Sequence, residues 1–172
     1  MNATIKITGP LLDRVRADLH RPHAFAYERV GFLLAGASPI GRNLLLTVRG
    51  YAPVADEDYE AAHNVGAQIG ADAMRKAVQA AYRPRSALLH IHTHGGRGVP
   101  RFSQIDLNSA KAFVPGFFQS IPRMPHGLLV LSDTDAAGLL WLSPNGQPIA
   151  VSRFDRVDRP LTHHWSARHE LA

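Results

Sequence analysis

Two histidines separated by one residue follow a short apolar segment near the middle of the chain. Residues 87–89 predict the start of a buried strand, after which come His92 and His94. Side chains two positions apart on a strand point to the same face, so these two imidazoles are expected to lie side by side. A catalytic zinc site holds three protein ligands and leaves the fourth position to water. The pair therefore supplies two ligands of a candidate hydrolytic zinc site.

A carboxylate suited to the third position opens the next predicted helix. Ser103 and Asp106 form a Ser-x-x-Asp start to a helical pattern, and Asp106 provides the third ligand oxygen. The same two residues also fit a purely structural helix start, in which Ser103 is the N-cap and Asp106 stabilises the first turn. His90 shares the parity of His92 and His94, so His90–His92 is an alternative ligand pair.

A second carboxylate stands at the entrance of an earlier strand. Glu28 precedes the apolar run Val30 to Ala35, which predicts a central strand buried on both faces. Hydrolysis at a zinc site needs a general base beside the metal-bound water, and glutamate is the usual choice. A carboxylate at a strand end is also typical of a solvated surface position. Glu28 is therefore a candidate base only in combination with the later histidines.

Taken together, these residues resemble the JAMM signature of the MPN/JAB-domain metalloproteases, which reads Glu, then His-Ser/Thr-His, then Ser-x-x-Asp. The matching positions are Glu28, His92, Thr93, His94, Ser103 and Asp106. The resemblance implies that His92, His94 and Asp106 bind one Zn²⁺ per chain. It also implies that Glu28 moves the proton and that Ser103 stabilises the oxyanion. Because Thr93 then takes the middle position of the motif, His92–His94 is preferred over the pair that contains His90.

The segment after the histidines is rich in glycine and departs from the family pattern. Gly95 replaces the proline that commonly follows the second histidine, and the gap to Ser103 is slightly longer than usual. Glycines permit close approach of a ligand's main chain. Arginine side chains can contact acidic residues or carbonyls of a partner. Gly95, Gly96, Arg97 and Arg101 are therefore predicted to contact the substrate.

The resemblance also implies a substrate class. With its compact length and the glycine-rich turn after the histidines, the chain resembles the bacterial deconjugating proteases of ubiquitin-like antiphage defence operons. The expected reaction is cleavage of a peptide or isopeptide bond after the C-terminus of a ubiquitin-like protein, and the expected partners are that protein, its conjugates and enzymes of the conjugation pathway. An extended C-terminal tail is expected to add as a strand to an exposed sheet edge. A sulfur-carrier-processing peptidase of the same family and a non-catalytic MPN scaffold are the alternatives.

Hydrophobic periodicity predicts one α/β domain of the α+β type. Strands are predicted over residues 3–7, 30–35, 43–54, 87–89, 128–131, 139–142 and 149–154, and helices over 11–19, 65–82 and 103–113. Residues 114–118 and 121–125 are predicted to be irregular and apolar, and either to pack onto the core or to form one wall of a groove. The resemblance implies a single MPN/JAB-like domain over residues 1–155, with a cytidine-deaminase-like central mixed β-sheet flanked by helices. Residues 156–172 are interpreted as a His-rich C-terminal tail.

Composition limits the other classes of function. The 172 residues include 45% hydrophobic and 19% charged side chains and no cysteine, which excludes a thiolate metal site and a cysteine nucleophile. The N-terminus lacks signal-peptide features and no apolar run is long enough to span a bilayer, so a cytoplasmic protein without a membrane partner is expected. The net charge of +5 comes from dispersed arginines, so no nucleic-acid partner is expected. Acidic residues 56–60, close to His63, are interpreted as a structural or partner-facing loop.

Overall fold

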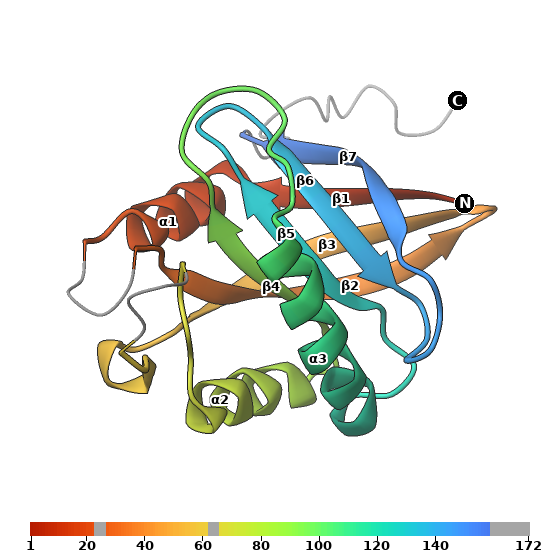
Figure 1. The fold of residues 1–172 in the computed structure, drawn as a ribbon. Helices are drawn as coiled ribbons and strands as arrows, with labels where there is room; N and C mark the ends of the chain where they lie inside the picture. The colour runs from red at the N-terminus through yellow and green to blue at the C-terminus, as the bar shows by residue number, and fades with distance from the viewer. Residues whose placement is uncertain (23–26, 62–65, 159–172) are drawn as a thin grey trace, which may run out of the picture.

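A computed structural model describes residues 1–22, 27–61 and 66–158 of the chain (Figure 1). Within these residues the strands are β1 (Asn2–Thr8), β2 (Val30–Ile40), β3 (Asn43–Pro53), β4 (Ala87–Thr93), β5 (His126–Leu131), β6 (Ala136–Trp141) and β7 (Ile149–Val157). The helices are α1 (Gly9–Leu19), α2 (Ala71–Tyr82) and α3 (Gln104–Ser120), with a 3-10 turn η1 (Asp56–Asp58). None of the helices in the described part of the chain is both long and apolar enough to cross a membrane.

The seven strands form a closed barrel in the order β1-β3-β2-β4-β5-β6-β7. The predicted MPN/JAB-like α/β architecture, with a central mixed sheet flanked by helices, is therefore wrong. The strand β1 pairs in parallel with both β3 and β7 and closes the sheet. Alternating hydrophobicity reports which face of a strand is buried, but it does not report what lies along either edge.

The interior of the barrel is filled by alternate side chains of its strands. In β1, Ala3, Ile5 and Ile7 point inward and are almost completely buried. Leu33 of β2 and Leu89 of β4 belong to the same cluster, as do side chains of α1. The alternation that predicted a strand near the N-terminus is thus explained by a core that every strand shares.

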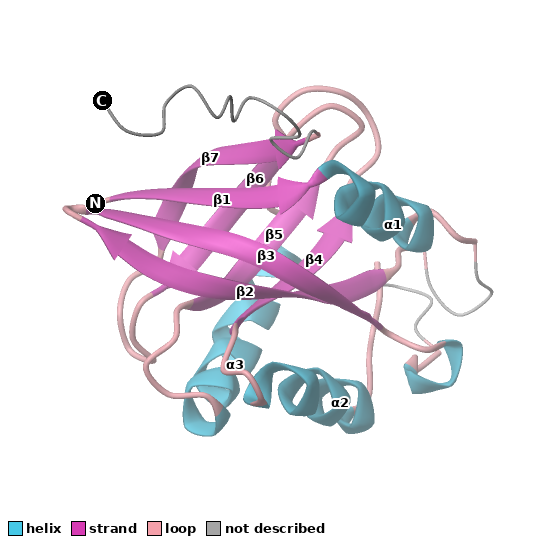
Figure 2. Cartoon of the chain, turned by 180° about the vertical axis from the view of Figure 1, so that it is seen from behind, coloured by secondary structure: helices cyan, strands magenta, loops and turns pink. Residues whose placement is uncertain are grey.

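A second apolar layer lies outside the barrel, where α2 and α3 pack on β2, β4 and β5 (Figure 2). Phe32 and Leu88 point outward into this layer, beside Ala77 of α2 and Phe117 of α3. Because Leu33 faces inward while Phe32 faces outward, β2 is buried on both faces, and that prediction is confirmed. The layer places α3 close to the end of β4, where the two histidines lie.

Two helix boundaries differ from the expectation. The helix α3 continues through Pro115 to Ser120, whereas residues 114–118 were expected to be irregular. Val114, Phe117 and Phe118 are buried, and this packing outweighs the break in the helical hydrogen bonds that proline imposes. The helix α2 begins only at Ala71.

The chain between η1 and α2 is extended over the described residues 66–70, where Ile69 forms a β-bridge with Tyr59. At the other end of the chain, β7 reaches Val157, two residues into the expected tail. The rest of that tail, from residue 159 to residue 172, and His63 lie outside the described residues.

His126, the first residue of β5, joins this strand to β4 and to the end of α3. Its Nδ1 accepts a hydrogen bond from the Leu88 amide at 3.1 Å, and its Nε2 donates to the Ile121 carbonyl at 2.9 Å. The imidazole is therefore neutral, with its proton on Nε2. Burial of the side chain lowers the pKa of His126 below its ordinary value.

This histidine is expected to make the fold sensitive to acid. Below about pH 6.5 the unfolded imidazole binds a proton that the folded one does not, so the free energy of unfolding falls as the pH falls, by up to about 1.4 kcal/mol per pH unit. His126→Gln keeps a donor and an acceptor but does not titrate. The stability difference between the two proteins should therefore shrink between about pH 7.5 and pH 5.5 in urea denaturation. Parallel pH curves would contradict this role.

Candidate metal centre

Pairing between strands brings Glu28 to the end of the histidine strand. Val30 of β2 is the partner of His92 in the antiparallel β2–β4 ladder, so the residues just before β2 lie opposite those just after β4. His94 follows β4 directly, and its amide donates a hydrogen bond of 2.8 Å to the Leu131 carbonyl at the end of β5. The backbone on both sides of the candidate metal centre is therefore held by the barrel wall.

The N-terminus of α3 supplies the third candidate ligand. Ser103 is the N-cap, and its Oγ accepts a hydrogen bond of 3.1 Å from the Asp106 amide, while the Ser103 amide donates one of 2.6 Å to Asp106 Oδ2. The capping interpretation of this motif is confirmed. Asp106 also faces the histidines, with Oδ1 at 3.1 Å from His92 Nε2 and Oδ2 at 3.5 Å from His94 Nε2. One motif therefore starts the helix and aims the carboxylate.

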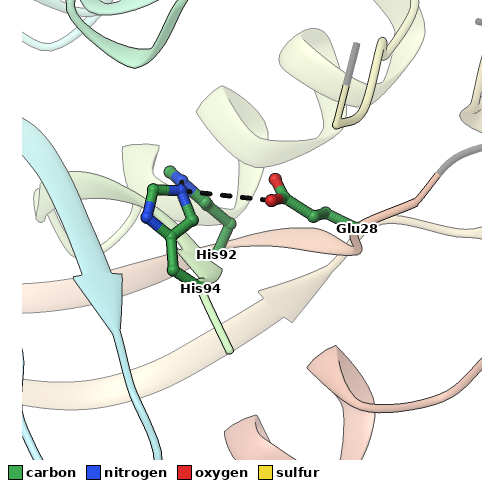
Figure 3. Close-up of side chains that lie close together, drawn as sticks. All are labelled: Glu28, His92 and His94. Atoms are coloured by element: carbon green, nitrogen blue, oxygen red, sulfur yellow. Dashed lines mark hydrogen bonds and ion pairs between the residues drawn. The ribbon is translucent and has the colours of Figure 1, made fainter. Parts of the chain in front are cut away.

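The spacing of these atoms matches the coordination shell of a small divalent ion. His92 Nε2 and His94 Nε2 lie 3.2 Å apart, which is close to their separations from Asp106. Zinc bonds of about 2.0–2.1 Å in tetrahedral geometry place neighbouring ligand atoms about 3.3 Å apart. Glu28 lies just outside, with Oε1 at 4.0 Å from His94 Nε2 (Figure 3). The ligand atoms of Glu28, His92 and His94 all lie within 4.8 Å of one another.

The charge of Asp106 suits a metal ligand. Burial acts to raise the pKa of this carboxyl, but the hydrogen bond and charge of His92, together with the hydrogen bonds of Ser103, hold the pKa of Asp106 well below its ordinary range. Asp106 is therefore ionised at neutral pH. A partly buried anion beside two imidazole nitrogens attracts a cation.

His90 lies beside this group rather than in it. Its ring contacts Phe32 edge-on, with centroids 5.4 Å apart, and Phe113 at 5.1 Å. Burial, followed by the neighbouring His92, lowers the pKa of His90 to about 3, so its imidazole is neutral. The Nδ1 atoms of His90 and His92 are both buried without a hydrogen-bond partner among the described residues.

Replacing His90 with phenylalanine is expected to leave the stability of the metal-free protein unchanged or to raise it. Removing a buried polar atom without a partner relieves a desolvation penalty of about 1–3 kcal/mol, and the new ring keeps the contacts with Phe32 and Phe113. One zinc should still bind per chain. Urea denaturation and metal analysis test both points. Loss of zinc from this variant would restore the alternative in which His90 is a ligand.

A pocket of about 580 Å³ opens onto the candidate metal centre. Glu28, Ser103 and the three candidate ligands line one part of it. Much of the remaining wall is apolar and comes from the extended segment, α2, α3 and the barrel; it includes Val30, Ala67, Ile69, Met74, Ile105, Ala112, Phe113 and Leu128. The pocket is large enough for substrate groups next to the ion, and it combines polar atoms at one end with an apolar wall, as ligand sites commonly do.

The glycine-rich loop after His94 lies elsewhere. The residues predicted to contact substrate, Gly95, Gly96, Arg97 and Arg101, are absent from the lining of this pocket. The loop is fastened to the β5–β6 turn, where the Gly98 amide donates to Thr134 Oγ1 at 2.8 Å and Ser132 Oγ donates to the Gly98 carbonyl at 2.7 Å. Gly96 and Gly98 have positive φ values of 96° and 84°, so turn geometry accounts for two of the glycines. A role of the loop in substrate binding stays a prediction.

Sequence reasoning missed the extended segment before α2. The Glu28 amide donates a hydrogen bond of 2.8 Å to the Gly66 carbonyl, and Gly66 and Ile69 line the pocket beside the candidate base. Nothing in the local sequence signals this contact, because it joins positions far apart in the chain and involves only backbone atoms of Glu28 and Gly66.

No protein-family model matches this chain, and no curated protein matches it. Among solved structures, the chain is similar to the N-terminal domain of STIL from Trichoplax adhaerens, with 12% sequence identity and a TM-score of 0.43. The match covers 81% of this chain and 41% of that one, so the chain spans less than half the length of the similar structure. A likeness at this level carries no argument about function. The JAMM resemblance stays a prediction that depends on the motif residues.

Proposed function

We propose that this chain is a zinc-dependent peptidase or isopeptidase that cleaves after the C-terminus of a ubiquitin-like protein. One observation carries the proposal. The Nε2 atoms of His92 and His94 lie 3.2 Å apart, and the two carboxylate oxygens of Asp106 lie 3.1 Å from the first and 3.5 Å from the second, close to the edge of a tetrahedral zinc shell. The donor set of two imidazoles and one carboxylate is typical of catalytic zinc, and all three residues line the pocket. A bound zinc would supply a water of lowered pKa.

Glu28 performs the proton transfer in this proposal. Its carboxylate lies next to the ligand group, at 4.0 Å from His94 Nε2, and lines the same pocket. It takes the proton of the attacking water and returns it to the leaving amine, so it acts first as base and then as acid. No proton therefore has to leave the site during the reaction.

Ser103 stabilises the oxyanion in this proposal. Its Oγ accepts from the Asp106 amide, so the hydroxyl proton is available to donate into the pocket. A donor aimed at a developing oxyanion contributes about 3–4 kcal/mol to stabilisation of the transition state. The helix cap fixes the position of that donor before the substrate arrives.

The substrate class follows from the motif resemblance. Deconjugation or precursor maturation of a ubiquitin-like protein, in a bacterial conjugation pathway of the antiphage-defence type, is the leading proposal. The presence of Glu28 and Ser103 beside the ligands favours an enzyme over a non-catalytic scaffold, because a scaffold needs neither residue. A sulfur-carrier-processing peptidase would use the same residues and differs only in its substrate.

Metal analysis combined with a cleavage assay tests the proposal. The purified protein should hold about one zinc per chain and cleave a ubiquitin-like protein fused through its C-terminus to a reporter; a chelator should stop cleavage and added zinc should restore it. His92→Ala with His94→Ala should lose both zinc and cleavage, whereas the exposed His20→Ala control should lose neither. Cleavage that survives removal of the metal would contradict the proposal. Cleavage of a sulfur-carrier fusion alone would favour the alternative substrate, and partner binding without zinc or cleavage would favour a scaffold.

A further inference from the structure

Gly66 lies directly against the carboxylate of Glu28. The Glu28 amide donates to the Gly66 carbonyl at 2.8 Å. A Cβ atom placed on Gly66 would overlap Glu28 Oε2 and would lie 2.8 Å from Glu28 Cδ. Gly66 is not among the glycines with positive φ, so any requirement for glycine here is one of space rather than of backbone conformation.

We propose that Gly66 is a positioning residue for Glu28. Because Gly66 has no side chain, the Glu28 carboxylate has room to lie within reach of the candidate metal centre. The inference rests on the proposed function, in which Glu28 is the base. A glutamate side chain has several rotatable bonds, so its carboxylate can occupy many places unless its surroundings limit them. The Glu28 carboxylate occupies the space that a side chain at position 66 would fill. In this position Glu28 Oε1 lies 4.0 Å from His94 Nε2.

The backbone that carries Gly66 is itself fastened. The Glu60 amide donates to the Gln68 carbonyl at 3.0 Å, the Gly70 amide donates to the Asp58 carbonyl at 3.0 Å, and Ile69 packs against the outer apolar layer. A side chain at position 66 would therefore displace the flexible Glu28 side chain rather than the segment. Because the end of a flexible side chain moves at little cost, the displacement should change catalysis much more than stability.

Gly66→Ala tests this inference. We expect kcat to fall about 10- to 100-fold, since a misplacement of about 1 Å at a reacting group has effects of this size. KM, the zinc content and the melting temperature should stay near their wild-type values. Gly36→Ala is the matched control, because a Cβ on Gly36 would meet no atom within 4 Å. An unchanged kcat in Gly66→Ala would overturn the proposal, and so would an equal loss in the control.

A double mutant separates positioning from a general disturbance. In Glu28→Asp the side chain is one methylene shorter, so its carboxylate should no longer reach Gly66. Adding Gly66→Ala to this variant should therefore lower kcat no further. The same loss in both backgrounds would show that Gly66 does not act through Glu28.

A crystal structure of the zinc-loaded Gly66→Ala variant gives a readout that needs no activity. The Glu28 carboxylate should leave its place near His94 while the three candidate ligands stay, and an unmoved carboxylate would overturn the proposal. If the wild-type protein binds zinc but cleaves nothing, the proposed function fails, and this structural comparison still decides the role of Gly66.

Discussion

Glu28→Gln is expected to lower kcat about 10²- to 10⁴-fold while the protein keeps its fold and its zinc. Glutamine has nearly the same shape as glutamate, so its contact with Gly66 and its place in the pocket lining are preserved. The amide, however, cannot accept the proton of the attacking water. Steady-state cleavage of a ubiquitin-like fusion, with zinc measured on the same samples, gives both quantities.

The zinc measurement decides between two roles for this carboxylate. Glu28 lies within 4.8 Å of the histidine nitrogens and is therefore close enough to be considered as a ligand. Loss of cleavage with full zinc content identifies it as the base, whereas loss of zinc identifies it as a ligand. Glu57→Gln, at an exposed position in η1, is the control and should change neither quantity. A wild-type rate in Glu28→Gln would contradict the proposed mechanism.

Arg29→Met is expected to lower the free energy of unfolding by about 3 kcal/mol. Only 2% of the Arg29 side chain is exposed. Its guanidinium donates to the Arg21 carbonyl at 2.7 Å and to Asp56 Oδ1 at 2.7 Å, and lies 5.8 Å from the ring centroid of Tyr59. Methionine replaces much of the aliphatic volume but removes the guanidinium and its hydrogen bonds to these acceptors. Urea denaturation at neutral pH measures the loss.

The matched control for this change is Arg14→Met, because Arg14 is exposed on α1. Surface substitutions of this kind usually change stability by no more than about 0.5 kcal/mol. Equal stability of the two variants would show that the Arg29 network contributes nothing specific. Since Arg29 adjoins Glu28, the same variant should also lower the rate of cleavage at temperatures where it is still folded.

The parts of the candidate metal centre that sequence could predict depend on local geometry. The shared parity of His92 and His94 on a strand was enough to expect convergent imidazoles, and their Nε2 atoms lie 3.2 Å apart. The Ser-x-x-Asp motif was enough to expect a helix start, and Ser103 and Asp106 form a reciprocal cap. In both cases the relevant distance is fixed by a few consecutive residues.

The remaining features depend on contacts between distant segments. Parallel pairing of β1 with β7 closes the barrel, and the periodicity of neither strand shows it. Burial of Phe117 and Phe118 carries α3 past Pro115, although proline is a local signal for a helix end. Gly66 reaches Glu28 through a backbone hydrogen bond, which has no signature in side-chain types.

Closure of the barrel changes how a polypeptide could be recognised. Each of the seven strands is paired with a neighbour on both sides over part of its length, so the described strands offer a visiting chain only short unpaired stretches, such as β3 beyond Thr47 on the side of β1. The expected addition of a substrate tail to a sheet edge is therefore limited to the strand stretches outside the ladders, and it stays a prediction. In the proposed function, a tail that enters the pocket would contact mainly the side chains that line it, so selectivity would depend more on the amino-acid sequence of the tail than on main-chain pairing.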